Sequence, residues 1–326
     1  MNSIIEVKNL SKSFGDIKAV NDVSFSVHQG EVFGFLGPNG AGKTTTINML
    51  ITLLKPTGGN AQVNGFDSQK DQDKVRASIG VIFQDPSLDD KLTARENLKF
   101  HSLLYNLSGE KMNQRIAEML EMVDLQKRKG DLVETFSGGM KRRLEIARGL
   151  LHHPKVLFLD EPTIGLDPQT RAHIWDYILN LRKREDITMF MTTHYMDEAE
   201  HCDRIAIMDR GKIIALDTPA NLKKAVGGDV ITLKTDNNTA AEKDIEEKFN
   251  LDVQIKDGEL VFTKEKGDEF IPELFKRISV GVQSISVHKP TLNDVFLKLT
   301  GREIRDEGAS NLDKARKQFR MRGGGH

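Results

Sequence analysis

Two kinds of hydrophobic pattern predict the strands of an α/β domain in the first two thirds of the chain. Apolar and polar residues alternate at Ile4–Val7 and Val23–Val27, as they do in half-buried strands. Longer apolar or β-rich runs predict further strands, and the run at Val156–Leu159 is typical of a central strand in a parallel sheet. These runs are Val32–Leu36, Ile79–Phe83, Val156–Leu159 and Thr188–Thr192.

The hydrophobic spacing becomes helical between Thr93 and about Leu150. Apolar residues recur there at helical intervals without a strong β run, which predicts a helical insertion over about residues 93–150. The insertion begins with Thr93, followed three residues later by Glu96, and this spacing fits a capping box.

A new pattern begins at about Gly227 and predicts a separate domain over residues 227–300. Its elements follow the order β-α-β-β-α-β of a ferredoxin-like α+β domain, with one more helix at the end. The preceding domain then covers residues 1–222, and 301–326 is expected to be a flexible tail. The expected strands and helices of the second domain are Val230–Leu233, Ala240–Phe249, Val253–Ile255, Leu260–Phe262, Pro272–Ile278, Val282–Val287 and Thr291–Leu299.

Charge and composition narrow the class of protein. The chain has 326 residues, and its 47 Lys and Arg nearly balance its 48 Asp and Glu. This balance gives no general reason to expect binding to nucleic acid or to an anionic membrane. The single cysteine suits a reducing compartment, and no apolar run approaches the ~20 residues of a membrane span. We expect a soluble cytosolic protein, whose membrane part, if it has one, belongs to another polypeptide.

A glycine-rich loop connects the Val32–Leu36 strand to a helix. Its spacing is G-x-x-x-x-G-K-[ST], whereas the dinucleotide pattern G-x-G-x-x-G fails because residue 45 is Thr. Glycines let backbone N–H groups turn inward, and the helix N-terminus adds partial positive charge, so this loop is suited to phosphate. Lys43 can reach the β- and γ-phosphates, and the Thr44 hydroxyl can hold Mg²⁺. We expect a nucleoside triphosphate at Gly37, Pro38, Asn39, Gly40, Ala41, Gly42, Lys43, Thr44 and Thr45.

Polar residues at the ends of other predicted strands complete a candidate hydrolytic site. Asp160 and Glu161 come where open α/β sheets bind ligands, at the carboxyl end of a buried strand. Asp160 can hold Mg²⁺ through a water, and Glu161 can orient and polarise the attacking water. Gln84 can reach Mg²⁺ or this water through its carbonyl oxygen. His194 can contact the γ-phosphate and fix the water relative to Glu161.

Two other features have a functional and a structural interpretation. Phe14 lies beside a turn and can stack on a nucleobase, or it can be an ordinary core residue. Ser137 can cap a helix whose N-terminus, with Gly138 and Gly139, is suited to an anion. A second anion site makes sense if it completes a clamp on another copy of the chain. The alternative is a plain helix cap before a solvated basic helix.

One group of His, Glu and Cys residues resembles a zinc site in its spacing. The spacing of His194, Glu198, His201 and Cys202 resembles that of metal ligands on a helix. We do not expect zinc, because His194 follows directly on a strand and so lies off the helix that carries the other three.

The order of these motifs resembles the ATPase of ATP-binding-cassette (ABC) transporters over about residues 3–220. The signature reads Phe-Ser-Gly-Gly-Met instead of Leu-Ser-Gly-Gly-Gln, but no phosphate-contacting Ser or Gly is replaced. The resemblance implies a P-loop NTPase fold with a mixed sheet and a helical insertion, acting on ATP with Mg²⁺. The resemblance also implies a role for each motif. It implies Gly37–Thr45 as Walker A, Gln84 as the Q-loop and Phe136–Met140 as the signature. It implies Asp160 and Glu161 as Walker B with its catalytic Glu, Asp167 as the D-loop, His194 as the switch, and Phe14, in place of the usual Tyr, as the adenine-stacking aromatic.

Two segments are similar to those of drug- and antibiotic-exporter ATP-binding subunits of the daunorubicin-resistance type. They are Phe136–Arg143 and Lys289–Gly301. The resemblance implies an ATPase at the cytoplasmic face of the cell membrane that drives export of a drug, antibiotic or lipid-like substrate through a separate permease. It also implies a head-to-tail pair of copies, and no nucleic-acid partner.

Two other functions are alternatives to transport. A soluble ABC protein acting on ribosomes or nucleic acid usually has two cassettes or long coiled coils, and this chain shows one cassette and no sustained heptads. A ligand-sensing ATPase would place its sensor in residues 227–288. A stabilising or subunit-contacting role for that domain is the alternative to a sensor.

Overall fold

The computed structural model describes residues 2–301, except 86, 186 and 257 and the side chains of 183–185. The expected tail therefore lies outside the described residues from 302 onward. Contacts divide the described chain into two compact units between Leu216 and Asp217, whereas the sequence placed the boundary at residues 222–227. No helix among the described residues is both long and apolar enough to cross a membrane.

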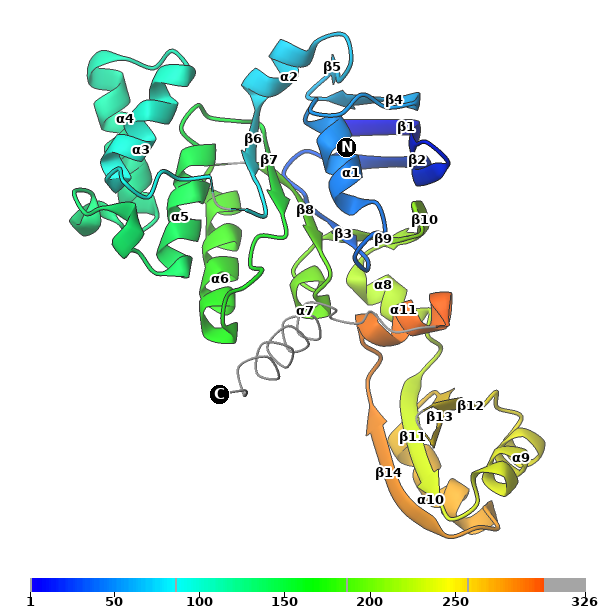
Figure 1. Ribbon diagram of the computed structural model, residues 1–326. Coiled ribbons are helices and arrows are strands. Elements are labelled where there is room, and N and C mark those ends of the chain that lie inside the picture. Colours follow the sequence, from blue (N-terminus) through cyan, green and yellow to red (C-terminus); the bar gives the residue numbers. More distant parts are fainter. Residues whose placement is uncertain (1, 86, 186, 257, 302–326) are drawn as a thin grey trace, which may run out of the picture. The chain divides into compact units, whose positions relative to one another are not determined.

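A six-stranded sheet forms the centre of the first unit (Figure 1). Strands β6, β7, β8, β3 and β9 pair in parallel, with Leu36 opposite Thr193 and Asp160 opposite Thr192. The carboxyl ends of β3, β7 and β8 therefore lie side by side. The order is β10 (Lys212–Asp217), β9 (Arg204–Asp209), β3 (Val32–Leu36), β8 (Thr188–Thr193), β7 (Val156–Asp160) and β6 (Ile79–Ile82).

A second sheet of the first unit is antiparallel, and two of its strands are longer than expected. Strand β1 (Ser3–Phe14) pairs with β2 (Ile17–His28) and with β4 (Gly58–Val63), which also pairs with the short β5 (Phe66–Asp67). The register of β1 against β2 shifts between Val7 and Leu10 and again further along. Such shifts interrupt the alternation of side chains, so the period-2 pattern marks only part of each strand.

Phenylalanine side chains fill the core beside the parallel strands. The rings of Phe25 and Phe35 meet edge to face at 4.9 Å between centroids, and Phe190 lies 5.0 Å from Phe35 and 5.4 Å from Phe158. Phe33, Phe35, Phe158 and Phe190 are fully buried. Because these rings come from β3, β7 and β8, their packing fixes the strands whose ends carry the candidate site.

Helices occupy the predicted insertion and the connections of the sheet. Thr93 caps α3 with both bonds of the expected capping box to Glu96. Two short 3₁₀ turns, Gln126–Arg128 and Val133–Thr135, precede α5. The helices of this unit are α1 (Lys43–Leu50), α2 (Gln72–Ser78), α3 (Ala94–Leu104), α4 (Gly109–Met122), α5 (Gly138–Gly149), α6 (Pro168–Glu185) and α7 (Met196–Ala199).

The second unit has the predicted ferredoxin-like order. Its antiparallel sheet runs β12-β13-β11-β14, and the helices α9 and α10 pack on it around a separate apolar core. The predicted start of α10 at Pro272 is wrong, because the helix begins at Gly267 and holds Pro272 in its interior. The elements are α8 (Pro219–Lys224), β11 (Asp229–Thr235), α9 (Asn238–Phe249), β12 (Gln254–Lys256), β13 (Glu259–Lys264), α10 (Gly267–Arg277), β14 (Val282–His288) and α11 (Leu292–Thr300).

Candidate functional site

The glycine loop connects β3 to α1 as the sequence predicts, and its backbone requires glycine at specific positions. Gly42 has a φ of 105°, and a Cβ atom there would lie 2.5 Å from the Ala19 carbonyl oxygen. A Cβ atom on Gly37 would lie 2.4 Å from the Met208 carbonyl oxygen. Larger residues at these positions would force the loop away from its neighbours, so the loop is held in one shape by close backbone packing.

Lys43 points back into this loop from the first turn of α1. Its ammonium group donates to the carbonyl oxygens of Gly37 at 2.7 Å and Pro38 at 3.2 Å, and it lies 3.6 Å from Oε1 of Glu161. The side chain is only 4% exposed, and burial lowers its pKa despite the nearby carboxylates. The loop therefore encloses a cation at the end of β3.

Asp160 is the last residue of β7 and binds two hydroxyl groups. Its Oδ1 accepts from Thr44 at 3.3 Å and from Thr192 of the neighbouring strand β8. Burial raises the pKa of the Asp160 carboxyl, and these bonds only partly offset the effect. The Thr44 hydroxyl and the Asp160 carboxylate are hard oxygen ligands of the kind that Mg²⁺ prefers.

Glu161 has a backbone conformation that is rare for a residue with a side chain. Its φ is 48°, in the left-handed region. Its N–H donates to the carbonyl oxygen of Thr192 at 3.2 Å and to the Thr192 hydroxyl at 3.1 Å, which holds the residue against β8. A left-handed residue costs about 1–3 kcal/mol and is typical of functional sites.

His194 follows β8 directly, and its Nδ1 lies 3.2 Å from Oε1 of Glu161. Burial works to raise the pKa of the Glu161 carboxyl, but the hydrogen bond and charge of His194, together with Lys43, lower it below its ordinary value. The carboxylate is therefore ionised at neutral pH, as an acceptor of protons from water must be.

The structure places the other predicted anion site at the N-terminus of α5, on the surface. Ser137 caps the helix by accepting from the N–H of Met140 at 3.3 Å, and both Ser137 and Gly138 are exposed. Asp167 is also exposed and caps α6, where its carboxylate accepts from the N–H of Thr170 at 3.0 Å and from its hydroxyl at 2.6 Å. The Asp167 and Ser137 segments adjoin each other, because a Cβ on Gly139 would meet the Thr170 side chain at 2.6 Å.

Two predicted residues are not joined to this cluster. Gln84 lies two residues beyond the end of β6 with an exposed side chain. Phe14 ends β1, is 50% exposed and has the Lys12 ammonium 5.1 Å from its ring centroid. Within the described chain, neither residue forms a hydrogen bond or ion pair with Lys43 or Glu161. The exposed ring is free to stack on a planar group.

Two buried charged residues of this region were not identified from the sequence. Arg142 of α5 donates to backbone carbonyls at the ends of β6 and β7. Glu198 of α7 is 1% exposed and accepts from the hydroxyls of Thr163 and, at 2.6 Å, Thr193. Burial raises the pKa of Glu198 to about 7. Both residues stand among other charged residues, with Arg142 between Lys141 and Arg143 and Glu198 after Asp197. The sequence alone does not distinguish such a charge from one on a solvated face.

The four residues with zinc-like spacing have separate surroundings. α7 ends at Ala199 and carries only Glu198 of the four, so the prediction that one helix carries Glu198, His201 and Cys202 is wrong. His194 pairs with Glu161, whereas His201 stacks on Trp175 at 4.9 Å. Cys202 is buried, and burial raises the pKa of its thiol. Among the described residues, no group of three or more His, Cys, Asp or Glu side chains is arranged to hold a metal ion.

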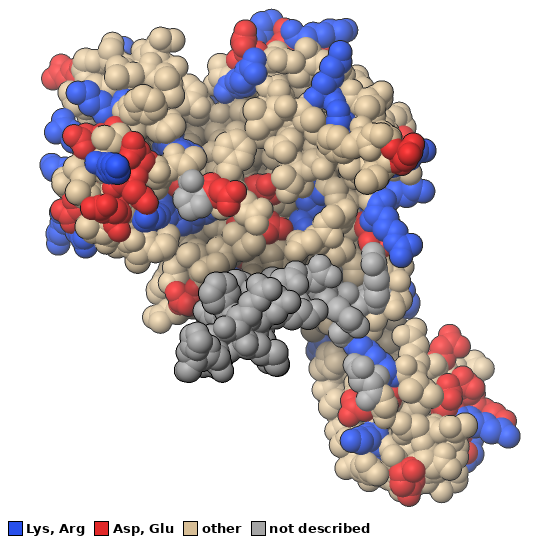
Figure 2. Space-filling model, viewed as in Figure 1, with Lys and Arg blue, Asp and Glu red and all other residues tan. Residues whose placement is uncertain are grey.

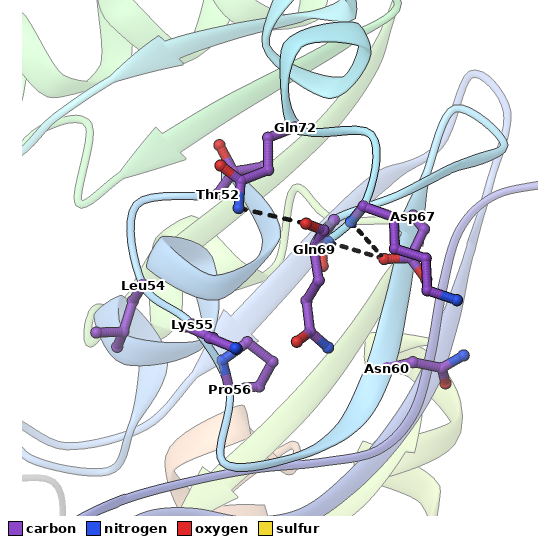
Figure 3. A pocket seen from close by; sticks show the side chains of 10 residues that line it. Thr52, Leu54, Lys55, Pro56, Asn60, Asp67, Gln69 and Gln72 are labelled. Atoms are coloured by element: carbon purple, nitrogen blue, oxygen red, sulfur yellow. Dashed lines mark hydrogen bonds between the residues drawn. The ribbon is translucent and has the colours of Figure 1, made fainter.

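A polar pocket of about 470 Å³ lies at the other end of α1 from Lys43 (Figure 3). Its lining includes Asp67, whose carboxylate accepts from the backbone of Gln69 and Lys70, and Gln72, which donates to the Gln69 carbonyl. Thr52 and Lys55, just after α1, line it as well. Because α1 separates this pocket from the glycine loop by about 12 Å of helix, it is not part of the candidate site.

Comparisons with protein families match both units. The model described as "ABC transporter" matches residues 20–164, and the model described as "ATP-binding protein DrrA1-3-like, C-terminal domain" matches residues 218–300. The resemblance in the sequence is therefore confirmed for both parts of the chain.

Two curated relatives match almost the whole chain. The linearmycin resistance ATP-binding protein LnrL of Bacillus subtilis (strain 168) is 39% identical over 93% of this chain and 100% of its own length. The daunorubicin/doxorubicin resistance ATP-binding protein DrrA of Streptomyces peucetius is 38% identical over 96% of this chain and 97% of its own length.

A solved structure confirms the fold of the first unit. The ATP-binding cassette MJ0796, a dimer bound to ADP and Pi in a post-hydrolysis state, superimposes with a TM-score of 0.59. It is 29% identical and covers 66% of this chain and 98% of its own. The chain belongs to the ABC transporter family, as an ATP-binding protein with the ABC ATPase fold and a DrrA-like C-terminal domain.

Proposed function

We propose that this chain binds and hydrolyses ATP to drive export through a separate membrane permease. The observation that carries the proposal is the convergence of Lys43, Thr44, Asp160, Glu161 and His194 at one edge of the central sheet. The loop amides and Lys43 bind the phosphates, and the exposed ring of Phe14 stacks on the adenine. The similarity to an ADP-bound cassette supports the nucleotide.

Thr44 and Asp160 would hold Mg²⁺, with Gln84 as a third oxygen ligand. The oxygen atoms of the first two are already neighbours, at 3.3 Å. When bound, Mg²⁺ supplies positive charge beside the phosphates.

Glu161 and His194 act on the attacking water. The low pKa of Glu161 keeps it ionised, so its carboxylate can accept a proton from a water that attacks the γ-phosphate. His194, whose Nδ1 lies against Oε1 of Glu161, orients the water relative to the phosphate. Lys43 stabilises the negative charge on the transferred phosphoryl group.

A second copy of the chain completes each site. Ser137 and Gly138 are exposed and present a capped helix N-terminus that suits the phosphates of ATP bound to the other copy. Two-fold symmetry then places the copies head to tail and forms two identical sites. Each site consists of the glycine loop of one copy and the N-terminus of α5 of the other. The dimeric state of the related cassette supports this arrangement.

The permease is proposed to contact the helical region. On α3 and at its end, the apolar side chains of Phe100, Leu103 and Leu104 are more than half exposed, and Tyr105 follows them. Such a group of exposed apolar residues is typical of a surface that binds a partner. This contact would place the protein at the cytoplasmic face of the cell membrane, and the resistance names of the relatives support a drug, antibiotic or lipid-like substrate.

Neither alternative function receives support. Both signs of charge are interspersed on the face in Figure 2, which does not favour binding to nucleic acid. A pocket in the second unit, lined by Val261, Gln254 and Asp294 among others, measures about 180 Å³, and pockets for small ligands usually measure about 300–1,000 Å³.

Co-purification tests the transport role. The Glu161→Gln chain is captured from its native membranes with Mg-ATP present, and the proteins that accompany it are identified. A stoichiometric multi-spanning protein is the expected result. Recovery of ribosomal or DNA-bound material without a membrane protein would contradict the transport role and leave the ATPase chemistry in place.

A further inference from the structure

Arg142 joins three separate segments around the candidate site. The guanidinium group of this α5 residue is buried and donates to the carbonyl oxygen of Phe83, just after β6, at 2.7 Å. It also donates to the carbonyl oxygens of Asp160 at 3.5 Å, Glu161 at 3.4 Å and Pro162. One side chain therefore binds the backbone on both sides of the strained Glu161 residue.

Two more residues on the same face of α5 bind the segment that follows Gln84. Glu145 is 1% exposed, accepts from Arg142 at 2.9 Å and accepts from the N–H of Ser87 at 2.9 Å. Arg148 donates to the carbonyl oxygen of Ser87 at 2.8 Å. Residues three apart lie on one face of a helix, so α5 presents a continuous row of charged groups to the chain beyond β6.

Only an arginine satisfies this set of acceptors. A guanidinium has five N–H donors in a rigid plane, whereas a lysine ammonium is a compact group with three. The carbonyls that Arg142 binds come from two strand ends, so a single compact donor cannot reach all of them. Glu145 neutralises the buried charge, which explains why the pair occurs together.

We propose that Arg142 is a positioning residue for ATP hydrolysis, which couples the exposed N-terminus of α5 to the backbone of Glu161. The inference rests on the proposed function above. Ser137 and Arg142 lie on one rigid helical segment, about 7.5 Å apart along its axis. When Ser137 contacts the nucleotide of the second copy, a shift of α5 therefore moves the Arg142 guanidinium and, with it, the backbone of Glu161. Through its bond to the Phe83 carbonyl, Arg142 also moves the Gln84 segment.

The test compares Arg142→Lys with Arg143→Lys. Lysine at 142 keeps the charge beside Glu145 but loses the shared carbonyl bonds. Arg143 is the next residue of α5, and its guanidinium binds the carbonyl of Val123 instead. We expect Arg142→Lys to lower kcat about 10- to 100-fold, as small misplacements of catalytic groups do, with ATP affinity close to wild type. The Tm should fall, because some buried carbonyls lose their donor, but the chain should stay folded at the assay temperature. Arg143→Lys stays within about twofold of wild type.

The same substitution is then made in the Glu161→Gln chain, where hydrolysis is followed in single turnovers. If Arg142 acts through Glu161, Arg142→Lys changes the residual rate less than about threefold there. An equal loss in both backgrounds, or no loss in the wild type, would overturn the inference. If Arg142→Lys does not fold, Glu145→Gln is used, because it weakens the bond that holds the Arg142 guanidinium in place. Glu145→Gln is also expected to lower kcat in the wild type and to change the residual rate of the Glu161→Gln chain less than about threefold. A Glu161→Gln chain with normal hydrolysis would instead contradict the proposed function.

Discussion

The ammonium group of Lys43 lies 3.6 Å from the carboxylate of Glu161, and both side chains are buried. The proposed phosphate-binding cation and the proposed base are thus paired with each other across the ends of β3 and β7. A triphosphate bound in the glycine loop would compete with Glu161 for Lys43. Binding of the triphosphate would then weaken the pairing of Lys43 with the Glu161 carboxylate.

Replacing Lys43 by Ala is expected to weaken ATP binding about 10- to 100-fold, because hydrogen bonds to a charged group contribute about 1.5–3 kcal/mol. Isothermal titration calorimetry with Mg-ATP measures the loss. Lys55→Ala is the matched control, since Lys55 is exposed and lies beyond the other end of α1. Equal affinities of the two variants would exclude Lys43 from the phosphate site.

Replacing Glu161 by Gln is expected to lower the rate of ATP hydrolysis by ~10²–10⁴, or about 3–5 kcal/mol, because the variant has no carboxylate to accept a proton. ATP binding should persist, and removal of the negative charge beside Lys43 favours it. Steady-state phosphate release and nucleotide affinity are measured on the same preparation. Normal turnover by the variant would refute the role given to Glu161.

Glu198 predicts a dependence of stability on pH. Burial raises its pKa to about 7 from the ordinary 4.5. Below about pH 4.5 the carboxyl is neutral in both states, and between 4.5 and 7 only the unfolded chain ionises. The native state therefore loses stability as the pH rises through this window, by about 3 kcal/mol in all, and the loss stays constant above pH 7.

Glu198→Gln has no such carboxyl, so the stability of the wild type relative to this variant should fall between about pH 4.5 and 7 and stay constant above pH 7. Urea unfolding, followed by fluorescence of the single tryptophan, Trp175, reports on this region. Glu200→Gln, at an exposed carboxyl two residues away, provides the control. A difference between wild type and Glu198→Gln that does not change with pH would show that Glu198 is not held neutral.

The sequence predicted most of the cluster because strand ends in a parallel sheet share one edge. Lys43, Asp160, Glu161 and His194 each follow an apolar run. The pairings of Asp160 with Thr192 and of Leu36 with Thr193 bring the ends of three strands together. The order of elements in the second unit was predicted from the pattern of strand-like and helical segments after Gly227. The predicted start of α10 at Pro272 was wrong, because the helix begins at Gly267 and accommodates Pro272 in its interior.

Arg142 and Glu198 could not be found in this way. The partners of Arg142 are backbone carbonyls from segments that are distant in the sequence, and backbone atoms leave no pattern of residue types. Glu198 binds Thr163 and Thr193, which look like ordinary loop and strand residues. Among the basic residues after Ser137, only the fold shows which are solvated and which are buried.

A mixing experiment tests most directly whether two copies share each ATP site. Lys43→Ala and Ser137→Arg are each expected to be inactive alone, because either change damages both sites of a symmetric dimer. In the mixed dimer, both changes fall in one site, and the other site has an intact Lys43 and an intact Ser137. Equal mixing should therefore restore single-turnover ATP hydrolysis to about a quarter of the wild-type amplitude. A mixture no more active than either variant alone would contradict the shared site.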